Sequence, residues 1–117
     1  MIPINTAENI SKAIIESAKL TFKNKIENIV ILKLTNDPYK SFHITFVLYN
    51  YFPISFIYDR GHFCSYIDYG TIKIPIKSDI EWNDNCDFKE YWRKIDKDVQ
   101  LRIPTKYLNK YYNVFKW

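Results

Sequence analysis

The fold is decided by residues 42–49, which read Phe-His-Ile-Thr-Phe-Val-Leu-Tyr. A large apolar side chain stands at every second position, so an extended chain places all of them on one face. These side chains are Phe42, Ile44, Phe46 and Leu48. Such sustained alternation predicts a β-strand with one face in the core.

Strand character continues on both sides of this segment. Residues 29–34 are almost continuously apolar and rich in β-branched side chains, which predicts a strand buried on both faces. Shorter alternating segments follow at residues 54–58, 63–67 and 72–76. The turn Asp59-Arg60-Gly61 and the residue Gly70 separate them, as in consecutive hairpins. The pattern predicts a four- or five-stranded, mostly antiparallel sheet.

Helical periodicity precedes the strands. Apolar residues recur at intervals of four from Ile10 to Phe22 and predict an amphipathic helix of about four turns. Asn5 and Glu8 stand three positions apart just before this pattern, which is the spacing of a capping box.

Helical periodicity also follows the strands. The apolar spacing over residues 88–95 predicts a short helix with Asp87 as its N-cap. Pro104 cannot continue a helix but starts one well, so a last helix is predicted over residues 105–112. We expect one α+β domain over residues 1–117, with an N-terminal helix, the sheet and C-terminal helices.

The composition fits one globular domain without catalytic equipment. The chain has 117 residues, of which 47% are hydrophobic and 26% charged, and this is enough to bury a core. It contains only two histidines and two cysteines, and no motif for a nucleophile or a metal. We therefore expect no enzyme activity, no cofactor and no metal site, with Cys64 and Cys86 as free thiols.

The distribution of charged and apolar residues limits the kinds of partner that we expect. The formal net charge is +4, but the lysines are mostly isolated and only three arginines are present. Phosphate recognition usually concentrates both residue types on one face, so nucleic acid is not an expected partner. The longest apolar run, residues 29–32, falls far short of the ~20 residues that cross a bilayer, and no export signal is visible. We expect a cytoplasmic protein with no membrane partner.

The two histidines support an alternative hypothesis, a small RNA-binding or metal-independent RNA-cleaving module. His43 is expected in the middle of a strand, and His62 directly after the turn at residues 59–61. One could act as general base and the other as general acid on RNA, provided that the fold brings them together. Nothing in their spacing shows that it does.

The C-terminal residues bear on the same alternative. Residues 102–117 contain no acid, several basic residues and many aromatic rings, which could stack on bases or contact phosphates. The helical spacing of Tyr107, Leu108, Tyr111 and Tyr112 favours instead a helix face packed against the core.

An acidic segment is the candidate site for binding a partner protein. Residues 79–87 contain no lysine or arginine, and the candidate residues are Asp79, Glu81, Trp82, Asp84, Asp87 and Glu90. An aromatic anchor among carboxylates suits a basic protein, because the ring supplies buried area and the charges accelerate encounter. Basic residues share the stretch after residue 88, where a solvated helix face with internal ion pairs is the competing interpretation.

Residues 101–108, Leu-Arg-Ile-Pro-Thr-Lys-Tyr-Leu, resemble the closing segment of small bacterial immunity proteins, including those paired with contact-dependent growth inhibition toxins. Residues 51–54, Tyr-Phe-Pro-Ile, and 58–61, Tyr-Asp-Arg-Gly, add to the resemblance. It implies a cytoplasmic, non-catalytic protein that binds one cognate toxin domain, commonly a nuclease, and blocks its active site. No binding residue is carried over by position, because such families differ at the binding surface.

The resulting hypothesis is that the acidic segment occupies the basic cleft of a toxin's C-terminal domain, with Trp82 as the anchor. A homodimer through an edge strand is a further expectation. It rests on residues 72–76, where Pro75 indicates an edge of the sheet.

Overall fold

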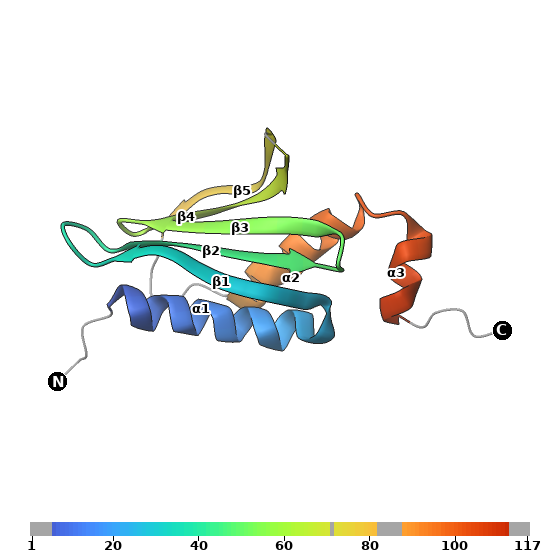
Figure 1. Cartoon of the computed structure of the whole chain (residues 1–117), viewed down its shortest axis with the longest axis horizontal. Helices are drawn as coiled ribbons and strands as arrows, with labels where there is room; N and C mark the ends of the chain where they lie inside the picture. The colour runs from blue at the N-terminus through green and yellow to red at the C-terminus, as the bar shows by residue number, and fades with distance from the viewer. Residues whose placement is uncertain (1–5, 71, 82–87, 113–117) are drawn as a thin grey trace.

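The computed structural model describes residues 6–70, 72–81 and 88–112; residues 69, 77–81 and 109–112 are described by their backbone alone. In chain order the elements are α1 (Ala7–Phe22), the 3-10 turn η1 (Lys23–Lys25), β1 (Ile26–Thr35), β2 (Ser41–Leu48), β3 (Phe52–Asp59), β4 (His62–Tyr69), β5 (Ile72–Glu81), α2 (Phe88–Gln100) and α3 (Thr105–Tyr112). The predicted α+β fold, with an N-terminal helix, an antiparallel sheet and C-terminal helices, is confirmed (Figure 1).

The sheet is a meander of five strands in the order β1-β2-β3-β4-β5, and each neighbouring pair is antiparallel. Strands β2 and β3 pair without interruption from Ser41 opposite Asp59 to Leu48 opposite Phe52. The β3–β4 hairpin turns at Arg60 and Gly61, whose φ angles are 49° and 87°. Positive φ at both central residues matches the right-handed twist of the flanking strands, and it explains the glycine.

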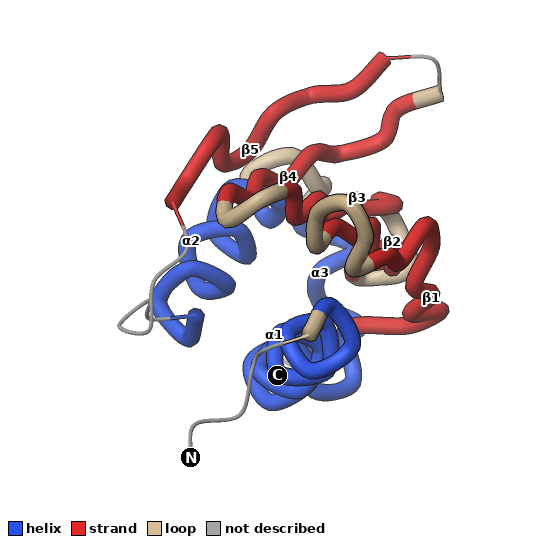
Figure 2. The backbone as a smooth tube through the Cα atoms, turned by 90° about the vertical axis from the view of Figure 1, so that its left-hand side faces the viewer, coloured by secondary structure: helices blue, strands red, loops and turns tan. Residues whose placement is uncertain are grey.

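Helices α1 and α2 cover one face of the sheet, which curves around them (Figure 2). Phe42, Ile44, Phe46 and Leu48 point into this layer and are at most 2% exposed. The alternation in residues 42–49 therefore identified the core face correctly.

Trp92 of α2 lies at the centre of the core and is fully buried. Its ring centroid is 5.8 Å from that of Phe22 on α1, 5.9 Å from Phe46 on β2 and 5.6 Å from Phe56 on β3. Edge-to-face and tilted aromatic contacts of this kind each add about 0.5–1.5 kcal/mol beyond area burial. The ring thus packs helices α1 and α2 against strands β2 and β3.

The N-terminus of α1 is capped differently from the prediction. Thr6, not Asn5, is the N-cap residue, and its side chain accepts a backbone hydrogen bond from the first turn. Asn36 Oδ1, in the β1–β2 loop, accepts the N–H of Ala7 at 2.7 Å, while its Nδ2 donates to Glu8 Oε1 at 2.9 Å. This bond lowers the pKa of Glu8 from its ordinary 4.5. Because Asn36 is distant from the helix in sequence, the spacing of residues near the helix start could not predict its two hydrogen bonds.

Strand β1 is an edge strand, so the prediction that residues 29–34 are buried on both faces was wrong. Val30, Ile31 and Leu32 are 46%, 39% and 41% exposed, and irregular pairing flanks them on each side. A continuous apolar run does not show where a strand lies in the sheet order. Strand β5 forms the other edge, as Pro75 indicated; dimerisation through it stays a prediction.

Among the described residues, no helix combines the length and the apolar character that a membrane span requires.

Candidate protein-binding face

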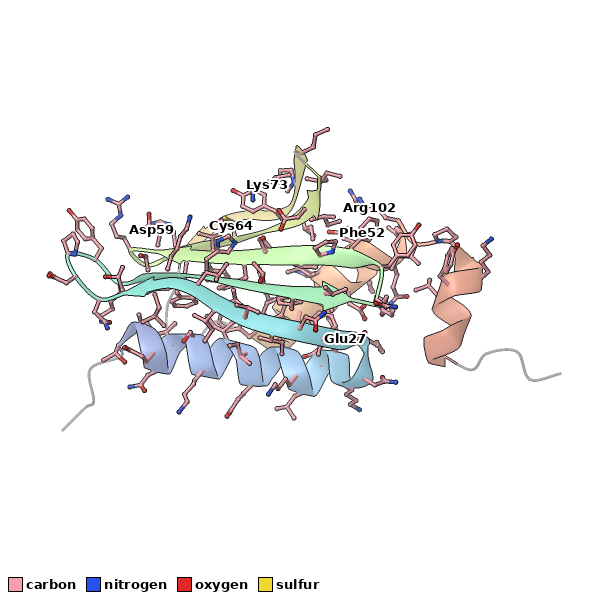
Figure 3. All side chains as sticks on the ribbon, viewed as in Figure 1. Glu27, Phe52, Asp59, Cys64, Lys73 and Arg102 are labelled. Atoms are coloured by element: carbon pink, nitrogen blue, oxygen red, sulfur yellow. The ribbon has the colours of Figure 1, made fainter. Side chains whose placement is uncertain are left out.

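The face of the sheet opposite α1 and α2 carries the side chains that alternate with the core residues. We call it the outer face and define it by His43, Thr45 and Val47 on β2, Ser55, Ile57 and Asp59 on β3, and His62, Cys64, Tyr66 and Asp68 on β4. None of the described helices lies on this face (Figure 2). Figure 3 shows Asp59, Cys64 and Lys73 on this side of the sheet, away from α1.

The centre of the outer face is formed by apolar and weakly polar side chains. The register places Ile57 between His43 of β2 and Cys64 of β4, and all three are half-buried. Tyr66 stands one step further along β4, opposite Ser55, and its hydroxyl lies 3.5 Å from the thiol of Cys64. This contact raises the pKa of Tyr66 from its ordinary 10.0. The Tyr66 hydroxyl is therefore protonated at neutral pH, and Ile57 beside it is apolar.

Two shallow hollows adjoin each other on this face. One, of about 400 Å³, is lined by residues that include Arg60, His62 and Tyr66. The other, of about 260 Å³, is lined by residues that include Lys33 and His43. Ile57 and Asp59 line both, so strand β3 forms the ridge between them. Since a water molecule takes about 30 Å³ of liquid, each hollow has room for a large side chain.

Charged pairs surround this centre. At the β3–β4 turn, Arg60 Nη2 lies 3.1 Å from Asp59 Oδ2, and its guanidinium carbon is 4.8 Å from the centre of the Tyr39 ring. Lys73 Nζ of β5 lies 3.1 Å from Asp68 Oδ1. Exposed pairs of this kind add about 0–1 kcal/mol to stability. These ion pairs therefore form a polar rim of the outer face and contribute little to the stability of the fold.

Asp68 is also tied to the centre of the sheet. Ser55 Oγ donates to Asp68 Oδ2 at 2.5 Å, and Ser55 is almost completely buried although it points outward. One carboxylate oxygen therefore accepts from the serine while the other faces Lys73. The arrangement fixes the orientation of Asp68 at the rim.

His43 is a residue of the outer face with a buried polar atom that lacks a hydrogen bond. Its Nε2 atom is buried and has no hydrogen-bond partner. Burial lowers the pKa of His43 from its ordinary 6.5; the charges of Lys73 and Lys33 lower it further, against the opposing effect of Asp68. The imidazole is therefore neutral at pH 7.

The two histidines share the outer face but line different hollows. His43 pairs with Ile57 and His62 with Asp59, so two strand spacings and two residues separate them. From ordinary strand spacing and rise, this corresponds to about 12 Å between their Cβ atoms. The ridge of Ile57 and Asp59 lies between them, so the fold does not gather them into one compact catalytic pair.

The acidic segment is only partly described. Asp79 and Glu81 lie on β5, where the backbone of Glu81 is paired with that of His62, so β5 ends next to the larger hollow. Trp82, Asp84 and Asp87 lie outside the described residues, and their role stays a prediction.

Glu90, the last of the candidate residues, is exposed on the first turn of α2. Its Oε1 lies 3.2 Å from Arg93 Nη1. This pair agrees with the competing interpretation of that half of the stretch, a solvated helix face with internal ion pairs.

The outer face was not predicted, because the sequence was examined for clusters of one charge sign and this face has none. The available signal was in the outward positions of the alternating strands. Val47, Ile57 and Tyr66 occupy positions where a fully solvated face would carry small or charged side chains. Among the described residues, no group of three metal-ligating side chains comes together.

Comparison with known proteins finds no matching family model, no matching curated protein and no matching solved structure.

Proposed function

We propose that this chain is a cytoplasmic, non-catalytic immunity protein that binds and neutralises a cognate bacterial toxin domain. The outer face is its main docking surface. The observation that carries the proposal is a broad sheet face that no described helix covers, with an uncharged centre at Ile57 and Tyr66 and a rim of paired charges.

This arrangement has the anatomy of a protein interface. Such interfaces combine a desolvated centre, where aromatic and aliphatic anchors dominate the energy, with a polar rim. The three strands of the outer face, about 4.8 Å apart and about 27 Å long, give a face on the order of 400 Å². A standard interface buries about 800 Å² on each partner, so the outer face supplies about half of one side.

The acidic segment supports a nuclease as the toxin. Nucleases bind phosphates in a basic cleft, which residues 79–87, four carboxylates without a lysine or arginine, would complement. The first residues of this segment, 79–81, form the end of β5, where Glu81 pairs with His62 beside the larger hollow. A toxin seated on the outer face would therefore meet the carboxylates at the same time, and they would occupy the position of its substrate.

The test is protection of growing cells. We expect a toxin gene beside this one. The toxin domain that it encodes is expressed alone, with the wild-type chain, and with variants of the chain. We expect the wild type to restore growth and Ile57→Arg to fail, because a charge at the centre of the interface would be buried without a partner.

The matched control is Leu20→Arg, which places the same charge at a side chain that is 76% exposed on α1. It should protect like the wild type. If Ile57→Arg protects equally well while remaining folded, the outer face is not the docking surface. If the wild type gives no protection, the proposed function is wrong.

A further inference from the structure

A second surface lies at the opposite end of the sheet from the β3–β4 turn. There the β2–β3 connection, residues 49–51, lies on the side of the molecule that carries helix α3 (Figure 1). The ring centroids of Tyr51 and Tyr107 are 5.4 Å apart, with 47° between the ring planes. Both side chains remain exposed, at 39% and 42%. Tyr107 is thus not part of a packed helix face as its spacing predicted, although Leu108 is packed against the core.

The positive charge of the protein is concentrated at this end of the chain. Residues 1–98 contain thirteen basic and thirteen acidic residues, whereas residues 99–117 contain four basic residues and no acid. The whole net charge of +4 therefore falls in this last part. Of these four cations, Arg102 and Lys106 are the ones whose side chains the structure describes.

One of these cations contacts a ring of the tyrosine pair, and another precedes α3 in the chain. Lys106 Nζ lies 5.2 Å from the centre of the Tyr107 ring. Arg102 is exposed between α2 and α3, and one of its guanidinium nitrogens donates to the carbonyl oxygen of Asp98 at 2.9 Å. Figure 3 shows Arg102 on the side of the molecule that carries α3.

One described acid close to the β2–β3 connection, Asp96 of α2, is hydrogen-bonded within the fold. Tyr49 Oη donates to Asp96 Oδ1 at 2.5 Å and accepts a hydrogen bond from Gln100 Nε2 at 3.0 Å. Asp96 is therefore held by the β2–β3 connection and is only half-exposed. These hydrogen bonds fix the position of the carboxylate but do not cancel its negative charge.

We propose that this end is a binding site for single-stranded nucleic acid, in which Tyr51 and Tyr107 stack on bases while Arg102 and Lys106 contact phosphates. Single strands alternate a flat base with a charged phosphate, and cations next to exposed rings match that alternation. Stacking tolerates any base, so the site is expected to show little sequence preference. The inference does not depend on the toxin-binding proposal, since none of these four residues belongs to the outer face.

The test is fluorescence anisotropy with labelled oligo(dT) and oligo(U) of about 15 nucleotides, between about 50 mM and about 200 mM salt. We expect binding that weakens with salt. Tyr107→Ala should weaken it about tenfold, as expected for the loss of one stacked base. Lys106→Gln should lower the slope of log affinity against log salt by about 0.7, as expected for the loss of one phosphate contact.

The matched control is Tyr39→Ala, which removes an exposed tyrosine that also stands against a cation, Arg60, but at the end of the sheet that carries the β3–β4 turn. It should leave binding unchanged. Circular dichroism of each variant checks the fold, and Tyr51→Ala replaces Tyr107→Ala if the latter unfolds.

Three results would overturn the site: no binding at the lowest salt, equal binding by the wild type and the α3 variants, or displacement of the oligonucleotide by poly-glutamate at matched charge concentration. The last would mean that the surface recognises acidic protein. None of these results affects protection against the toxin, so the two proposals fail separately.

Discussion

The indole nitrogen of Trp92 donates a hydrogen bond to Ser17 Oγ at 2.8 Å, and this bond joins α2 to α1 across 75 positions of sequence. Ser17 Oγ in turn donates to the carbonyl oxygen of Ile14 at 2.7 Å. Because Trp92 is completely buried, its N–H has to find a partner inside the protein. The bond fixes the two helices relative to each other beneath the sheet whose other face we propose as the docking surface.

Ser17→Ala leaves the Trp92 N–H buried and unpaired, and the free energy of unfolding should fall by about 1–3 kcal/mol. Thr21→Ala is the control, since its hydroxyl donates only to the Ser17 carbonyl within the same helix, at 3.0 Å, and leaves no buried donor behind. Urea unfolding measures both. Equal losses in the two variants would show that the tertiary bond contributes nothing.

Acid should weaken the protein through His43. Its pKa in the folded protein is below the ordinary 6.5, because burial and the charges of Lys73 and Lys33 disfavour the imidazolium. The unfolded chain therefore binds the proton first as pH falls, and stability is lost from pH 6.5 down to the folded pKa. Above 6.5 this contribution is complete.

His43→Gln removes that titration. Urea unfolding at about pH 7.5 and about pH 5.5 should give a smaller difference for the variant than for the wild type. An identical difference in both proteins would contradict the assignment.

Alkali should weaken the protein through Tyr91. Its hydroxyl is buried and lies 2.5 Å from Ser65 Oγ, and burial raises its pKa far above the ordinary 10.0. Above pH 10 the unfolded chain loses this proton while the folded chain keeps it, so stability falls as pH rises further.

Ultraviolet titration tests this directly. In the wild type, Tyr91 should ionise only when the protein unfolds, and the wild-type curve minus that of Tyr91→Phe should show one late, cooperative step. A difference curve that rises gradually near pH 10 would mean that Tyr91 is accessible to solvent.

Reversal of charge in the acidic segment tests the electrostatic part of the proposed function. Asp84→Lys and Asp87→Lys should slow association with the toxin domain and reduce the salt dependence of the association rate, because the carboxylates accelerate the encounter of the two proteins. Stopped-flow mixing at several salt concentrations measures this. Association rates equal to those of the wild type would remove the segment from the docking surface.

The sequence predicted features that depend on near neighbours in the chain. The alternation of Phe42, Ile44, Phe46 and Leu48 identified the core face, and the Asp59-Arg60-Gly61 turn identified a hairpin, because both patterns are local. The order of strands is not local, so the apolar run at residues 29–34 did not reveal that β1 is an edge.

The same limit applies to the candidate sites. The bonds of Asn36 to the start of α1 join residues 28 and 29 positions apart, and no local spacing encodes them. Tyr107 has a helical spacing that suits burial, but the position of α3 leaves it against Tyr51 at the surface. The outer face consists of side chains from three strands, which only the register brings together.

Titration calorimetry of the purified chain with the toxin domain that we expect beside its gene measures the proposed interaction itself. We expect a one-to-one complex that Ile57→Arg weakens about a hundredfold and Leu20→Arg leaves intact. No heat of binding with the wild type, or equal affinity for the Ile57→Arg variant, would contradict the proposal.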